Sequence, residues 1–182
     1  PAPSGQVYEY DEENRLKAVR RASDNALLLE IAYDAIGRRV TSTDHLNAGE
    51  ACGSAPAVTR HVYAGLETLE EHLSCDGGTN FTLAREFLWG ERFPEPVAMV
   101  THGGVAGGVG GPSVPAGESV YHYLHDALGS VVALTNASGR VVERYTYDPY
   151  GRTVIEQTNL VTGVPTGRLD ASAYGNPFAW TG

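Results

Sequence analysis

The chain has 182 residues, enough for one ordinary domain with a sizeable core, and 42% hydrophobic and 19% charged residues are typical of a globular protein. A formal net charge of −9 and a pI near 5.0, without a basic stripe, argue against nucleic-acid binding. No apolar run approaches the roughly 20 residues of a membrane-spanning helix, so no membrane span is expected. Because the chain starts at Pro1, we expect a processed protein or an internal piece of a longer one.

In chain order, short alternating segments are separated by turn residues at regular spacing, which is typical of β-hairpins. The pattern predicts an all-β fold, an antiparallel meander of β-hairpins. Strands are expected at residues 6–10, 15–20, 27–33, 38–43, 58–63, 68–74, 81–89, 97–101, 120–124, 130–135, 140–147 and 152–157. Residues 158–173 are expected to be irregular.

One motif recurs along the chain, at residues 8–15, 33–38 and 145–152. In each copy an alternating strand ends in Tyr-Asp, makes a tight turn and restarts at Arg. Since one repeat unit cannot bury its own apolar face, a repeat favours an architecture of stacked units over a compact enzyme. The repeat-motif residues are Tyr8, Tyr10, Asp11, Tyr33, Asp34, Gly37, Arg38, Tyr145, Tyr147, Asp148, Gly151 and Arg152.

Each residue type of the motif has a structural role. The tyrosine is expected to stand on the sheet face with its hydroxyl near the wet side. The aspartate begins the turn by accepting backbone N–H bonds, and glycine supplies a backbone conformation that other residues rarely adopt. The arginine is expected to pair with an aspartate of an adjacent repeat. Rows of such tyrosines could also stack on sugars.

Other candidate sites are few. Cys52 and Cys75 could form a structural disulfide in an exported protein or stay as two unpaired thiols in a reducing compartment. Asn80 and Asn136 each begin a glycosylation sequon at an expected turn. No catalytic set, metal site or cofactor motif stands out, because the Gly-rich residues 103–117 lack the Lys-Ser/Thr ending of a P-loop.

The repeat motif resembles the YD-repeat, or RHS-repeat, family. Residues 121–131, with Tyr121, Tyr123, Asp126 and Gly129, resemble the start of the RHS repeat-associated core. Asn176, Pro177 and Phe178 resemble a later step of that core. The resemblance implies β-hairpins laid side by side in a curved or spiralling sheet.

The resemblance divides the chain into YD-repeat hairpins (1–102), a Gly-rich flexible insertion (103–117), and RHS core-like hairpins with a C-terminal extended segment (118–182). The rest of the core, its self-cleavage aspartates and a toxin are not expected within these residues. About a dozen strands at roughly 4.8 Å spacing make a panel too narrow to close a large shell, and its edge strands would be open to pairing.

The resulting hypothesis is a non-enzymatic structural protein, extracellular or at the cell surface, without cofactors. It would form an extracellular fibre or the wall of a shell, paired with copies of itself or with the rest of a longer RHS chain. One alternative is a segment of a bacterial polymorphic toxin that encloses the toxin. Another is a carbohydrate-binding module that holds glycans on its tyrosine rows.

Overall fold

A computed structural model describes residues 5–46, 52–53, 55–92, 94–103 and 119–179. The described chain is all-β, and thirteen strands follow one another in the sheet in the same order as in the sequence. Neighbouring strands run antiparallel in the pairs from β1–β2 to β5–β6 and from β7–β8 to β12–β13. The prediction of an antiparallel hairpin meander is therefore confirmed. Most of the Gly-rich insertion lies outside the described residues.

The strands end where turn residues interrupt the alternation. Their bounds are β1 Gln6–Tyr10, β2 Leu16–Arg21, β3 Leu27–Tyr33, β4 Arg39–Asp44, β5 Ala57–Ala64, β6 Glu67–Ser74, β7 Thr82–Trp89, β8 Pro96–Thr101, β9 Ser119–His125, β10 Val131–Asn136, β11 Val141–Tyr147, β12 Thr153–Thr158 and β13 Pro165–Leu169. Both ends of each of the twelve expected strands lie within one residue of these bounds.

The strand β13 corrects the expectation that residues 158–173 are irregular. Its first four residues are exposed, so the segment carries no apolar alternation from which a strand could be predicted. Backbone pairing holds it instead, with Leu169 opposite Ile155 and Gly167 opposite Gln157 of β12. A neighbouring strand thus imposes a structure that the local sequence does not indicate.

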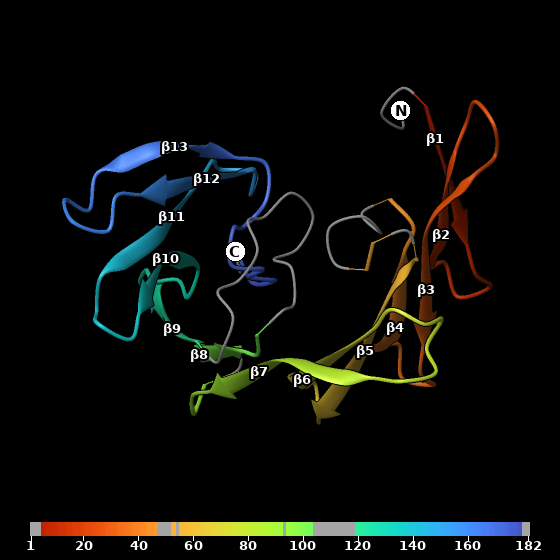
Figure 1. The fold of residues 1–182 in the computed structure, drawn as a ribbon, viewed down its shortest axis with the longest axis horizontal. Helices are drawn as coiled ribbons and strands as arrows, with labels where there is room; N and C mark the ends of the chain where they lie inside the picture. Colours follow the sequence, from red (N-terminus) through yellow and green to blue (C-terminus); the bar gives the residue numbers. More distant parts are fainter. Residues whose placement is uncertain (1–4, 47–51, 54, 93, 104–118, 180–182) are drawn as a thin grey trace. The chain divides into compact units, whose positions relative to one another are not determined.

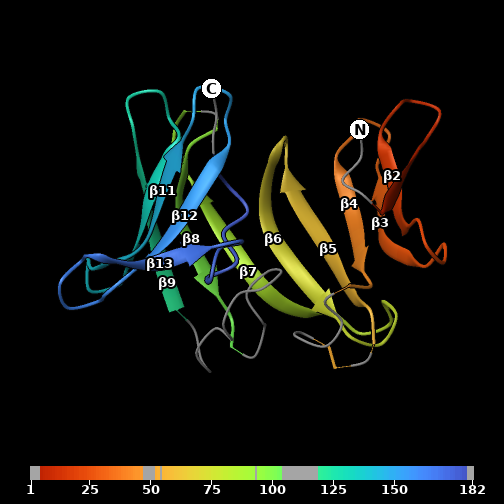
Figure 2. The same ribbon diagram turned by 90° about the horizontal axis from the view of Figure 1, so that it is seen from above.

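The chain divides into two compact units, unit 1 at residues 1–83 and unit 2 at residues 84–182. The boundaries predicted at 102/103 and 117/118 mark changes of sequence composition, and they stay a prediction. In unit 1 the strands β1–β6 lie side by side (Figure 2). Its buried apolar positions in the described residues are Ala18, Val19, Leu28, Ile31 and Ala57.

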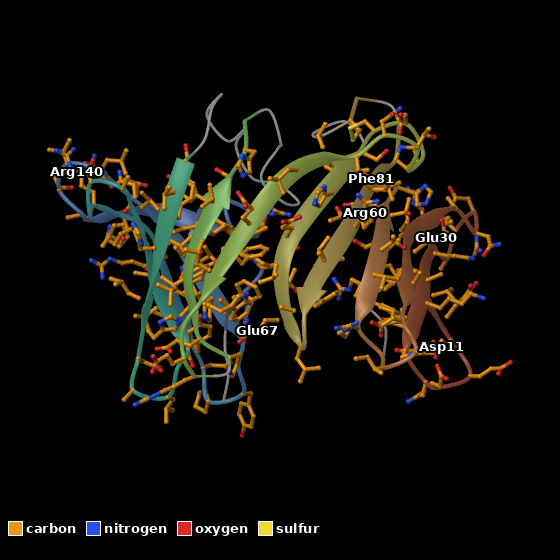
Figure 3. The ribbon with its side chains drawn as sticks, turned by 90° about the horizontal axis from the view of Figure 1, so that it is seen from below. Asp11, Glu30, Arg60, Glu67, Phe81 and Arg140 are labelled. Atoms are coloured by element: carbon orange, nitrogen blue, oxygen red, sulfur yellow. A yellow bond between two sulfur atoms is a disulfide. The ribbon has the colours of Figure 1, made fainter. Side chains whose placement is uncertain are left out.

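The β6–β7 turn of unit 1 is held in place by a disulfide bond and a cation–π contact. Cys52 and Cys75 form a disulfide bond across 23 residues of sequence. The Arg60 guanidinium lies 4.2 Å from the centre of the Phe81 ring, and Figure 3 shows the two side chains beside one another. The first hairpin turn, with Asp11, is labelled in the same view.

In unit 2, strands β8–β13 curve around the C-terminal segment, residues 170–179, which lies on their concave side (Figure 1). The buried cluster of this unit is Phe87, Met99, Tyr121, Tyr123, Val131, Leu134, Val142 and Tyr145. Tyr174 and Phe178 of the C-terminal segment pack against that cluster. The core of unit 2 is thus shared between the sheet and a polypeptide that is not part of it.

Candidate functional site

Five turns in the described chain share one hydrogen-bond pattern, and they begin at Asp11, Asp34, Asp126, Asn136 and Asp148. The first residue donates its N–H to the carbonyl of the fifth, and the fourth donates its N–H to the carbonyl of the first. The first side chain accepts N–H bonds from the third and fifth residues, at 2.8–3.0 Å. One side-chain oxygen therefore replaces two bonds that the turning backbone cannot make itself.

The fourth residue of each turn has a left-handed backbone. Gly37 has a φ of 87° and Gly151 a φ of 81°, and Asn14 holds the same place in the first turn at 62°. Glycine has no Cβ to clash in this region, and asparagine is among the side chains that tolerate it. The pattern Asp-x-x-Gly/Asn is thus the local requirement of this turn.

Arg15 and Arg38 form their ion pairs within their own turn, so the prediction of a pair with an aspartate of an adjacent repeat is wrong for these two arginines. Arg15 Nε donates to Asp11 Oδ2 at 2.7 Å, and Arg38 Nε donates to Asp34 Oδ2 at 2.7 Å. The first and fifth residues are paired by a backbone hydrogen bond at the base of the turn. The arginine side chain is therefore close to the aspartate of its own turn.

These hydrogen bonds lower the pKa of both carboxyls. At Asp11 the largest cause is the backbone N–H of Arg15. At Asp34 burial acts in the opposite direction, but the bonds from Arg38 and Ile36 outweigh it. Both aspartates are therefore held as the charged acceptors that the turn needs.

The same arginines also contact the next hairpin at that end of the strands. The Arg15 guanidinium lies 4.8 Å from the centre of the Tyr33 ring, and that of Arg38 lies 5.0 Å from the Tyr63 ring. Arg38 Nη1 also donates to the carbonyl of Gly65. Each arginine thus closes one turn and covers the tyrosine that leads into the next.

The tyrosine hydroxyls complete this link, which we call the tyrosine ladder. The hydroxyl of Tyr33 donates to the Leu16 carbonyl at 2.9 Å, and that of Tyr63 donates to the Arg39 carbonyl at 2.7 Å. Tyr147 donates to the Val131 carbonyl in the same way. In each case the acceptor lies five residues after the first residue of the preceding motif turn. Burial, and then the Asp126 charge, raise the pKa of Tyr147 to about 12, so its hydroxyl remains a donor.

The turn at Asp126 departs from the motif at two places. His125 stands where the copies at Asp11, Asp34 and Asp148 have tyrosine, and Ser130 stands where the other four copies have arginine. His125 Nε2 and Ser130 Oγ are buried without a hydrogen-bond partner in the described part of the chain. The copy that resembles the RHS core thus lacks the arginine–tyrosine contact with its neighbours.

The concave face of unit 2 is centred on a buried carboxylate that sequence analysis missed. Glu143 is fully buried, and it accepts hydrogen bonds from the Tyr145 hydroxyl, from Ser172 Oγ at 2.7 Å and from the Ala173 N–H at 2.6 Å. Burial raises the pKa of Glu143, and these bonds offset only part of that effect. The strand alternation was the available signal, because it places Glu143 on the same face as Tyr145 and Tyr147.

Aromatic rings hold the rest of the C-terminal segment against this face. The Phe178 ring lies 5.0 Å from Phe87, 5.0 Å from Trp89 and 6.0 Å from Tyr123, measured between ring centres. Asn176 accepts the Phe178 N–H at 2.9 Å and donates to the Phe178 carbonyl at 2.6 Å, which fixes the Asn-Pro-Phe turn. These contacts bring the predicted core-like residues of β9 and of the C-terminus together in one cluster.

The remaining candidate residues occupy structural positions. Tyr8 donates to Gln6 Oε1 at 2.8 Å, and Tyr121 packs on Tyr174 with ring centres 4.8 Å apart. Both sequon amides are engaged: Asn80 Nδ2 donates to Asp76 Oδ2 at 2.6 Å, and Asn136 Oδ1 accepts the N–H groups of its own turn.

No group of three or more His, Cys, Asp or Glu side chains in the described part of the chain is arranged to hold a metal ion. No helix in the same residues is long and apolar enough to cross a membrane.

Comparison with solved structures relates this arrangement to toxin complexes. The chain superposes on a TcdB2–TccC3 complex with a TM-score of 0.54 and 17% identity over 88% of its length. It also superposes on a pore of the Photorhabdus luminescens Tc holotoxin with a TccC3 mutation, with a TM-score of 0.52 and 17% identity over 82% of its length. A third match is TcdB2–TccC3 without its hypervariable C-terminal region, with a TM-score of 0.52 and 18% identity over 83% of the chain. The likeness is one of fold. The chain spans about 7% of the length of each of these structures. No family model and no curated protein matches it.

Proposed function

We propose that this chain is a wall segment of an exported RHS-repeat protein, in which the concave face of the sheet encloses another stretch of polypeptide. The observation that carries the proposal is the C-terminal segment of unit 2. It lies on the concave face in a conformation other than a strand, held by aromatic rings and by Glu143. A sheet face that buries an irregular segment can serve as the inner surface of a container.

Two further observations support this function. The order of the YD and core-like motifs resembles RHS proteins, whose bacterial members enclose a toxin. The fold is like that of Tc toxin structures, which are much longer than this chain. The proposal assigns the chain no catalytic role and places it outside the cytoplasm, in keeping with the Cys52–Cys75 disulfide.

Limited proteolysis with chymotrypsin tests whether the concave face shields what it holds. The Tyr150 side chain is 92% exposed at a turn tip, so cleavage after it is the internal control for accessible sites. We expect cleavage after Tyr150 to precede cleavage after Tyr174 and Phe178. Cleavage after Tyr174 as fast as after Tyr150 would contradict the proposal.

A fibre is the second candidate, because β1 and β13 are the two end strands of the sheet order and each is a possible pairing edge. Electron microscopy of the purified chain over a concentration series, with and without reductant, separates the two. Ordered filaments would favour the fibre, and a monomer at all concentrations would favour the wall segment.

Glycan binding on the tyrosine rows gains no support from the described residues. The Tyr145 side chain is only 3% exposed, and Tyr33 and Tyr147 are half-buried with their hydroxyls bonded to backbone carbonyls. A stacked sugar needs an open ring face, which these side chains do not offer.

A further inference from the structure

A cavity of about 290 Å³ lies between two neighbouring turns of unit 2, the β7–β8 turn and the turn at Asp126. Arg92 and Glu95 line it from the first turn, and His125, Asp126 and Leu128 line it from the second. The strands β8 and β9 beside it are already paired with each other. A ligand of this cavity therefore contacts side chains and turns, and it does not add a strand to the sheet.

In unit 1 an arginine side chain fills the equivalent space between turns, and its contacts show what that space binds. Arg15 Nε donates to the Asp11 carboxylate of its own turn, and the guanidinium lies over the Tyr33 ring. Arg15 Nη1 also donates to the Asp34 carbonyl of the next turn, at 3.4 Å. Arg38 makes the same three kinds of contact one hairpin further on. A guanidinium between turns thus takes a carboxylate on one side, a ring beneath it and an acceptor on the other side.

The cavity of unit 2 presents the same kinds of partner. The Glu95 carboxylate lies at the base of the β7–β8 turn, so close to Gly90 that a Cβ there would collide with it, and it accepts the Arg92 N–H at 3.3 Å. His125 stands in the place of the ladder tyrosine, and its Nε2 is buried without a partner in the described residues. Asp126 uses Oδ1 for its own turn, which leaves Oδ2 as an acceptor. Two carboxylates and an unpartnered ring nitrogen favour a flat, positively charged donor.

We propose that this cavity binds a guanidinium group, the side chain of an arginine that a separate polypeptide presents. The guanidinium donates to the carboxylates of Glu95 and Asp126 and to the Nε2 atom of His125, which gives the buried nitrogen a partner. A planar group with five donors satisfies these acceptors together, whereas a lysine ammonium is a single point of charge. The inference goes beyond the proposed function, because the lining of the cavity shares no residue with the contacts that hold the C-terminal segment.

Titration of the whole chain with N-acetyl-arginine methylamide tests the proposal, with the ring protons of His125 followed by NMR. We expect a saturable shift of these protons. The matching citrulline probe, which has the same shape without the charge, and the lysine probe should each bind at least about threefold more weakly. Glu95→Gln and Asp126→Asn should each weaken the arginine probe roughly threefold to tenfold. Asparagine keeps the turn intact, since Asn136 accepts the same two N–H bonds in its own turn.

Two more variants separate a cation site from general attraction to an acidic chain. Arg92→Ala removes a like charge from the lining and should tighten binding about twofold to threefold. Glu91→Gln is the matched control, because Glu91 is exposed in the same turn but does not line the cavity, and it should bind the probe like the unaltered chain.

Four results would overturn the inference: no saturable shift of the His125 protons, equal binding of the arginine and citrulline probes, weaker binding by Arg92→Ala, or equal weakening by Glu91→Gln and Glu95→Gln. Weaker binding by Arg92→Ala would indicate an anionic ligand instead. Tighter binding of free L-arginine than of the capped probe would contradict a polypeptide as the source of the guanidinium.

Discussion

Removing the Glu143 carboxylate should destabilise unit 2 strongly. Glu143→Ala leaves three buried donors without an acceptor, namely the Tyr145 and Ser172 hydroxyls and the Ala173 N–H. A buried donor that loses its partner costs about 1–3 kcal/mol, and relief of the carboxylate's own burial offsets part of the sum. We expect a loss of roughly 3–5 kcal/mol in the free energy of unfolding, measured by urea titration with tryptophan fluorescence.

Glu143→Gln removes the charge of the Glu143 side chain but keeps its shape. The amide keeps one oxygen for the two hydroxyls but turns an NH₂ group toward the Ala173 N–H, so donor faces donor. We expect a smaller loss of about 1–3 kcal/mol, and we expect faster chymotrypsin cleavage after Tyr174 in both variants. This second variant keeps the test valid even if Glu143→Ala does not fold.

The pH dependence of stability shows whether burial or hydrogen bonding dominates the pKa of Glu143. Burial raises the pKa of Glu143 above its ordinary value of 4.5, so the folded state holds the proton more tightly than the unfolded chain. The stability from this group is complete below pH 4.5 and is lost as the pH rises through the raised pKa. The cost of Glu143→Gln should therefore be largest in acid and should shrink as the pH rises.

The tyrosines near Glu143 do not contribute to the expected change of stability with pH. Tyr121, Tyr145 and Tyr174 have pKa values raised mainly by burial, so all three stay neutral through this range. Glu91→Gln, at an exposed position of the same unit, is the matched control and should change stability by less than about 0.5 kcal/mol. A cost of Glu143→Gln that grows with pH would refute the reasoning, because the hydrogen bonds would then outweigh burial.

Five further variants test the ladder, the turns and the disulfide by the same unfolding measurement. Tyr33→Phe removes one ladder bond and should cost about 0.5–1.5 kcal/mol, whereas Tyr10→Phe should cost nothing; equal costs would contradict the ladder. Gly37→Ala should cost about 1–2 kcal/mol because φ is 87°, and Gly37→Asn should cost less, since asparagine holds that place in the first turn. Replacing Cys52 and Cys75 by serine should cost about 3 kcal/mol for the 23-residue separation, and an intact free-thiol signal in the native chain would exclude the bond.

The strand positions could be predicted closely because their signals are local. Alternation along Leu27–Tyr33 and the turn residues on either side of it mark the same strand in the sequence and in the structure. The turn chemistry is local as well, since Asp34 bonds residues only two and four positions away. A pattern that closes within five residues is visible in the sequence.

The concave face could not be predicted because its contacts join distant residues. Glu143 and Ser172 form a hydrogen bond although they are 29 positions apart in the sequence. Nothing in the sequence around either residue indicates the other as its partner. The arginine pairing was mistaken for a similar reason, because the sequence shows many carboxylates and only the geometry of the turn selects the one in the same loop.

The C-terminal segment and the ladder meet at the copy that departs from the motif. After Ser130, the Val131 carbonyl accepts the Tyr147 hydroxyl, and the Val131 N–H donates to the Ala179 carbonyl at 3.1 Å. The turns at Asp11 and Asp34 are joined to their neighbours by an arginine, whereas this one, which has serine, is joined by backbone of the enclosed segment. The wall of unit 2 therefore depends on the polypeptide it holds, so loss of the Glu143 contacts should loosen β10 together with the C-terminal segment.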